Sequence, residues 1–183
     1  MMIAETRPGV KEVFFMKRNE QLQTLVLSAL FAAAVTVTTA YILHFPLPTG
    51  GYIHIGDALI YLGACLLPLP WAMAAGAVGG ALADLLTAPM WALPTFFIKA
   101  LICLPFTRKD ETLLSRRNLA AVVVSGLLSP ALYGLVNVAF TGLWSAFLPQ
   151  FLGTLLQGVA SGAVFLVLAG GLDKVGLKRR LAL

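Results

Sequence analysis

Charged side chains are scarce in this sequence. Asp, Glu, Lys and Arg make up 11% of its 183 residues, whereas apolar residues make up 59% and the mean hydropathy is +0.88. Soluble globular domains contain about 25% charged and about 45–50% apolar residues, so this chain has too little polar surface to cover a water-soluble domain. The composition therefore excludes a soluble enzyme and predicts one small domain within a lipid bilayer.

Cysteine is also scarce, and the motifs of common catalytic sites are missing. The two cysteines, Cys65 and Cys103, lie in apolar runs and provide neither a disulfide framework nor a zinc site. The sequence contains no Gly-x-x-x-x-Gly-Lys-Ser/Thr phosphate loop, no Gly-x-Ser-x-Gly and no His-Glu-x-x-His. We therefore expect no catalytic residue, metal or cofactor, and this chain does not itself hydrolyse ATP.

Clusters of proline and glycine divide the apolar sequence into an all-α bundle of six predicted transmembrane helices. A polar leader (1–20) precedes them and a basic tail (174–183) follows. The second helix has only about 11–12 residues and reaches about 17 Å, short of a hydrocarbon core of about 30 Å. Neighbouring loops must therefore dip into the membrane. The predicted helices, with ends uncertain by about 2–4 residues, are 21–43, 57–68, 71–86, 94–106, 119–142 and 149–172.

Lys and Arg gather in three segments that six spans place on one side of the membrane. By the positive-inside rule that side is the cytoplasm, so both termini are predicted to be cytoplasmic in a plasma-membrane protein. The net charge of +5 thus reflects topology and does not indicate a nucleic acid partner. The cations of the three segments are Arg7, Lys11, Lys17, Arg18, Arg108, Lys109, Arg116, Arg117, Lys174, Lys178, Arg179 and Arg180.

Three ionisable side chains fall within the predicted spans: Asp57, Asp84 and Lys99. Each costs roughly 2.5–3.5 kcal/mol to insert and therefore needs a reason to be there. Asp84 and Lys99 can form an ion pair that locks two helices together, or one of them can bind a solute. Asp57 can cap the N-terminus of the second helix with its carboxylate, or it can contribute to a solute site.

Asn137 is expected at the same depth as these three, in the half of the membrane facing away from the cytoplasm and beneath the outer loops that carry His54 and Trp91. Tyr133 is expected one turn deeper than Asn137, and Gln157 near the middle of the last helix. Each polar side chain alone can be a strut between helices, but independent struts should scatter through the membrane. Their gathering beneath the outer loops predicts a binding site. The candidate binding residues are His54, Asp57, Asp84, Trp91, Lys99, Tyr133, Asn137 and Gln157.

Small residues one helical turn apart mark three predicted helices. The first helix carries Ala29 with Ala33, and also Ser28 with Ala32. Such faces allow helices in lipid to approach closely. Most should pack inside the bundle, and at least one can meet a partner subunit. The other two helices carry Ala72, Gly76 and Gly80, and Gly158 and Gly162.

Three segments resemble the substrate-binding S components of energy-coupling-factor (ECF) vitamin transporters, above all the riboflavin and pyrimidine-precursor subgroup. They are PTGGYIHIGD at 48–57, GAVGGALAD at 76–84 and PTFFIK at 94–99, and the likeness extends over residues 20–173. The resemblance implies a six-helix protein that captures a micronutrient outside the cell. It also implies a transmembrane scaffold subunit, met by Ala29 and Ala33, and two ATP-binding cassette ATPases. The leader is longer than this family implies, and Met16 is a candidate start.

The available aromatic and amide groups favour a flat heteroaromatic solute such as a vitamin or vitamin precursor, held by stacking and a few hydrogen bonds. Two alternatives stay open at this point. The chain can be a membrane scaffold or assembly protein that binds no ligand. A membrane enzyme acting on lipid would need an acidic cluster or a metal site, which two scattered aspartates do not provide.

Overall fold

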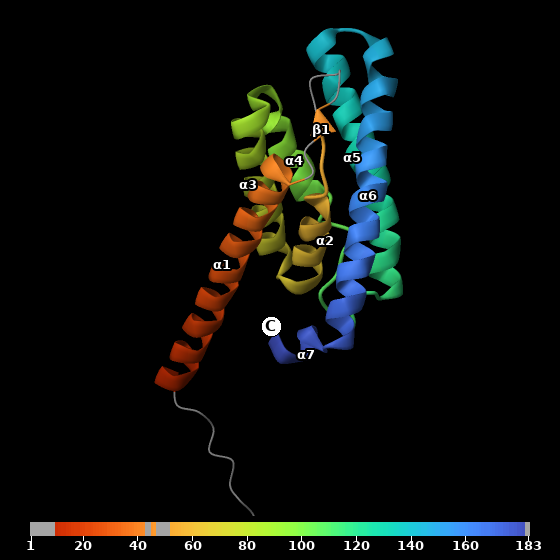
Figure 1. Ribbon diagram of the computed structural model, residues 1–183. Coiled ribbons are helices and arrows are strands. Elements are labelled where there is room, and N and C mark those ends of the chain that lie inside the picture. Colours follow the sequence, from red (N-terminus) through yellow and green to blue (C-terminus); the bar gives the residue numbers. More distant parts are fainter. Residues whose placement is uncertain (1–9, 43–44, 47–51, 182–183) are drawn as a thin grey trace, which may run out of the picture.

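The computed structural model describes residues 10–42, 45–46 and 52–181, and nearly all of them are helical (Figure 1). Four stretches are long and apolar enough to cross a membrane, which confirms a multi-pass, all-helical membrane protein. The helices over two other predicted spans have only ten residues each, about 15 Å at 1.5 Å per residue. The four long stretches are Asn19–Tyr41, Leu69–Thr87, Arg116–Thr141 and Trp144–Lys174.

A helix occupies each of the six predicted ranges, with two main differences. α1 begins at Val10, so the second half of the predicted leader is helical. α4 ends at Leu101 and not near residue 106, because the backbone tightens into three-residue turns ahead of Pro105. The helices are α1 (Val10–Tyr41), α2 (Asp57–Leu66), α3 (Leu69–Thr87), α4 (Ala92–Leu101), α5 (Arg116–Thr141), α6 (Phe147–Lys174) and α7 (Leu177–Leu181).

Short elements connect the helices at the end of the molecule that carries the α5–α6 connection. β1 (Phe45–Pro46) pairs antiparallel with β2 (Tyr52–Ile53), while the residues between them, 47–51, lie outside the described part of the chain. The 3-10 turn η1 (Pro89–Trp91) joins α3 to α4, and η2 (Trp144–Ala146) joins α5 to α6. The Pro/Gly-rich segment before α2 thus contains a small hairpin.

The helices form two groups. α1 packs along α3 and α3 along α4, whereas α5 packs along α6. α2 lies between the groups, where it contacts α1, α3 and α6, and α4 also touches α5 (Figure 1). A site built from α2, α4 and α6 therefore lies at the boundary between the two groups.

Small residues set the closest approaches between helices. A Cβ at Gly79 of α3 would lie 2.7 Å from the carbonyl of Ala32, and Thr36 donates to the Gly79 carbonyl at 3.0 Å. In α6, a Cβ at Gly158 would lie 3.2 Å from the carbonyl of Gly126 in α5. These contacts show that the Ala32 face of α1 and the Gly158 face of α6 serve internal packing.

Backbone and side-chain hydrogen bonds fix the basic end of the bundle. The Asp173 carboxylate accepts the backbone N–H groups of Leu113 and Leu114 at 2.8 and 3.0 Å, which ties the loop between α4 and α5 to the end of α6. Lys178 in α7 donates to the carbonyl of Asp110 at 2.6 Å. Burial lowers the pKa of the Lys178 ammonium below its ordinary value.

Candidate functional site

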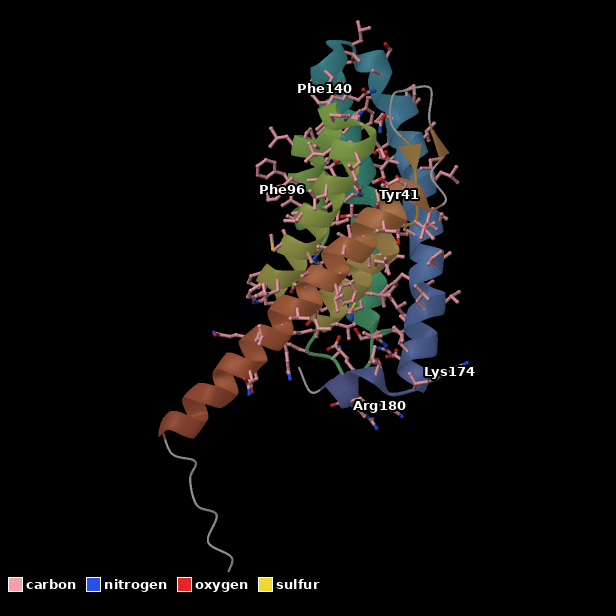
Figure 2. The ribbon with its side chains drawn as sticks, turned by 60° about the vertical axis from the view of Figure 1, so that its left-hand side comes forward. Tyr41, Phe96, Phe140, Lys174 and Arg180 are labelled. Atoms are coloured by element: carbon pink, nitrogen blue, oxygen red, sulfur yellow. The ribbon has the colours of Figure 1, made fainter. Side chains whose placement is uncertain are left out.

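A small polar cavity lies between the two helix groups at the end that carries η1 and η2. Its volume is about 30 Å³, room for about one water molecule. Trp91 in its wall contacts Phe140, and Figure 2 shows Phe140 at the opposite end of the molecule from Lys174 and Arg180. The lining residues are His54, Asp84, Trp91, Tyr133, Gln150, Thr154 and Gln157.

A buried ion pair adjoins this cavity. Lys99 Nζ lies 2.6 Å from Asp57 Oδ1, and both side chains are only 1% exposed. Gln157, which lines the cavity, donates from Nε2 to Asp57 Oδ2 at 3.0 Å. The three side chains join α2, α4 and α6, and the amide of Gln157 connects the pair to the cavity.

This arrangement corrects two expectations. The N-cap of α2 is Gly56, and no side chain of the described residues caps the helix, so the prediction that Asp57 caps α2 is wrong. The prediction of an Asp84–Lys99 ion pair is also wrong, because the carboxylate that contacts Lys99 is that of Asp57. Gly80 lets the lysine stem pass α3 closely, since a Cβ there would lie 2.8 Å from Lys99 Cγ, and the ammonium reaches Asp57 at the start of α2.

Aromatic rings form one wall of the cavity. The centroids of Trp91 and Tyr133 lie 5.7 Å apart, and those of Trp91 and Phe140 lie 5.2 Å apart. The Tyr133 hydroxyl shares a hydrogen bond of 2.7 Å with Thr95 Oγ1. The ammonium of Lys99 lies 5.3 Å from the centre of the Tyr133 ring. These contacts hold both rings in place in the arrangement that the structure shows.

A polar stripe on α6 supplies the facing wall through Gln150, Thr154 and Gln157, and sequence reasoning identified only Gln157 of the stripe as a site residue. Gln150, Thr154, Gln157 and Ser161 are all buried, and their spacing of four, three and four residues places them on one helix face. Gln150 Nε2 donates to Thr154 Oγ1 at 3.2 Å, and Ser161 donates to the carbonyl of His54 at 3.4 Å. Polar residues at helical spacing in an apolar segment were the available signal.

Of the remaining candidates, His54 lines the cavity, whereas Asn137, Ala29 and Ala33 lie elsewhere. Asn137 is absent from the cavity lining, and its Nδ2 donates to the carbonyl of Ala146 at 3.0 Å, which holds η2 against α5. His54 is 5% exposed, and its Nδ1 accepts the backbone N–H of Gly56 at 3.0 Å. On α1, Ala29 and Ala33 are exposed, whereas the carbonyl of Ala32 contacts α3.

Comparison with known proteins identifies the chain. The family model for the S component of the ECF-type riboflavin transporter matches residues 19–174. A Pyrococcus woesei protein, described as an uncharacterized protein in the gap 3′ region, is 35% identical over 154 residues, which cover 81% of this chain and 97% of that protein. The chain therefore belongs to the S-component family of ECF-type riboflavin transporters, as the substrate-binding, non-enzymatic membrane subunit for riboflavin-type uptake.

Proposed function

We propose that the chain captures riboflavin or a close flavin relative from outside the cell in the cavity between its two helix groups. The observation that carries this proposal is the lining of the cavity. Five of the eight residues expected to bind substrate line it: His54, Asp84, Trp91, Tyr133 and Gln157. Asp57 and Lys99 support it through Gln157, whereas Asn137 is assigned to structure.

The cavity must widen to admit this substrate. Its volume of about 30 Å³ is far below the roughly 300–1,000 Å³ of ordinary ligand pockets. Its walls come from both helix groups, with Asp84 and Trp91 on one side and Tyr133 and Gln150 on the other. We infer that α5 and α6 separate from α3 and η1 as the flavin enters, and that the structure represents the closed arrangement.

The proposed topology has six crossings, with both termini in the cytoplasm. Two crossings are made by the short helices α2 and α4, together with the loops beside them. The distribution of charge supports this topology, because basic residues gather at the end opposite the cavity. In the described chain these are Arg108, Lys109, Arg116, Arg117, Lys174, Lys178, Arg179 and Arg180.

The proposed partners are a transmembrane scaffold subunit and two ATP-binding cassette ATPases, since the sequence has no phosphate loop of its own. The exposed face of α1 that carries Ala29 and Ala33 is assigned to the scaffold. Two observations support this: the Ala32 face of α1 is already used by α3, and small exposed residues let a second helix approach.

The substrate assignment is tested on the purified protein in detergent. Mass spectrometry of the small molecules that copurify should identify a flavin, and added riboflavin should raise the unfolding temperature. Asp84→Asn should weaken binding by about 10-fold or more, because a hydrogen bond to a charged group contributes about 1.5–3 kcal/mol. Absence of any copurifying ligand, with no thermal shift across a vitamin panel, would support the ligand-free scaffold protein.

The partner face is tested by uptake and binding together. Ala29→Trp and Ala33→Trp should abolish riboflavin uptake in cells that supply the scaffold and ATPases, because the indole holds the scaffold helix away. Riboflavin binding by the isolated subunit should persist. Ala163→Trp, at an exposed alanine of α6, is the matched control and should transport normally. Unimpaired uptake by both α1 variants would reject this face.

A further inference from the structure

Two buried polar atoms in the cavity wall have no hydrogen-bond partner within the described part of the chain. They are the indole Nε1 of Trp91 and the side-chain oxygen Oε1 of Gln150. These residues are only 3% and 4% exposed, and both line the cavity. Because nearly all buried polar groups in proteins are paired, these two atoms are suited to bind polar groups of a molecule in the cavity.

The two atoms have opposite hydrogen-bonding character. An indole N–H can only donate, and the Trp91 ring is held between Tyr133 and Phe140. The Gln150 amide donates from Nε2 to Thr154 Oγ1 at 3.2 Å, which leaves its Oε1 as an acceptor. The residues that line the cavity therefore carry one unused donor, on η1, and one unused acceptor, on α6.

We propose that Trp91 and Gln150 recognise the amide-like edge of a heteroaromatic ring. Trp91 Nε1 donates to a ring carbonyl, and Gln150 Oε1 accepts from the neighbouring ring N–H. The ligand class is a cyclic lactam or imide, and the inference rests on the proposed function, since the pyrimidinedione ring of riboflavin carries N3–H between two carbonyls. Thr154 is a positioning residue that holds the Gln150 amide in its accepting orientation.

The test compares riboflavin with its N3-methyl derivative, which lacks the ring N–H. The affinity of each is measured for the purified wild-type protein by quenching of flavin fluorescence. Wild-type protein should bind the methylated ligand at least about 10-fold more weakly, because the acceptor loses its donor and meets a methyl group. Trp91→Phe should weaken both ligands by roughly 3- to 10-fold, and Trp144→Phe, at an exposed tryptophan, should weaken neither.

Gln150→Met removes the acceptor at nearly constant side-chain length. It should weaken riboflavin binding and reduce the preference over the methylated ligand to less than about threefold. Gln23→Met, at an exposed glutamine of α1, should keep the full preference. If Gln150→Met fails to fold, Thr154→Val serves instead, because the freed amide can rotate and the same preference should shrink.

The outcomes separate the two proposals. Equal wild-type affinity for the two flavins, or an unchanged preference in the folded Gln150→Met or Thr154→Val variant, overturns the recognition by Gln150 and leaves the proposed function standing. Unchanged affinities in Trp91→Phe overturn the role of Trp91 alone. If the wild-type protein binds neither flavin, the proposed function fails and this inference fails with it.

Discussion

The buried polar side chains at the two ends of the helical bundle differ in how fully they are hydrogen-bonded. At the basic end, the Asn118 side chain makes three hydrogen bonds to the backbone of Thr107 and Leu113, and the Asp173 carboxylate accepts two more. At the cavity end, Trp91 Nε1 and Gln150 Oε1 have no partner among the residues that the structure describes. Asn118 and Asp173 use their hydrogen-bonding capacity to hold loops in place, whereas Trp91 and Gln150, which line the cavity, keep capacity that a solute can use.

Between the two ends lies the buried pair of Asp57 and Lys99, which joins the helix groups through Gln157. Both charges are desolvated, and each is compensated by a close partner. Such a pair contributes little compared with well-packed apolar residues, but removal of one member is costly. The ion pair should therefore contribute to the stability of the fold and not to substrate binding, although it adjoins the proposed binding site.

The largest expected effect follows from removing one charge of this pair. Lys99→Met leaves the Asp57 carboxylate buried without a cation and should lower the free energy of unfolding by about 3–5 kcal/mol, measured by thermal unfolding in detergent. The double variant Asp57→Leu/Lys99→Met should recover much of this loss, because no unpaired charge remains.

Lys109→Met, at an exposed lysine, is the matched control and should change stability by no more than about 0.5 kcal/mol. A loss below about 1 kcal/mol in Lys99→Met would show that Asp57 does not depend on the lysine. Weakened riboflavin binding at unchanged stability would show instead that Lys99 contributes to substrate binding.

Features that depend on local sequence were predictable. The predicted helices 71–86 and 119–142 correspond to α3 and α5 within three residues at each end, because apolar composition and the breakers at helix ends are read without knowing the fold. Part of the cavity lining was also predictable: the depth of Asp84 along its span and the place of His54 and Trp91 in the outer loops put these residues near one another, as the cavity lining shows.

Features that depend on packing were not predictable. Asp84 and Asp57 were both at a suitable depth to meet Lys99, so depth alone could not distinguish them, whereas the packed structure places Asp57 Oδ1 2.6 Å from Lys99 Nζ. Asn137 was assigned to the site by depth alone, but η2 brings the Ala146 carbonyl to its amide. In contrast, the stripe that includes Gln150 and Thr154 was present in the sequence as a helical period and could have been found.

A smaller effect is expected at the basic end. Asp173→Asn removes one acceptor from the pair of N–H groups at Leu113 and Leu114, so it should lower the free energy of unfolding by about 1–3 kcal/mol. Riboflavin affinity should stay within about twofold, because the cavity is at the other end. Glu111→Gln, at a carboxylate that is 85% exposed, should change neither quantity. A tenfold loss of affinity in Asp173→Asn would show that the two ends are coupled.

The smallest expected effect is that of Asn137→Ala. It gives the sharpest test of the comparison, because it shows whether a side chain's role depends on its hydrogen bonds or on its position in the bundle. Asn137 lies toward the cavity end of α5, yet its amide already donates to the Ala146 carbonyl. If the existing hydrogen bond decides the role of Asn137, Asn137→Ala should lower the free energy of unfolding by about 1 kcal/mol. Riboflavin affinity should then stay within about twofold, as expected for Asp173→Asn. If location decides, affinity should fall about as far as in Asp84→Asn. Parallel unfolding and fluorescence titrations on the two variants distinguish these results, and the second would reject the comparison.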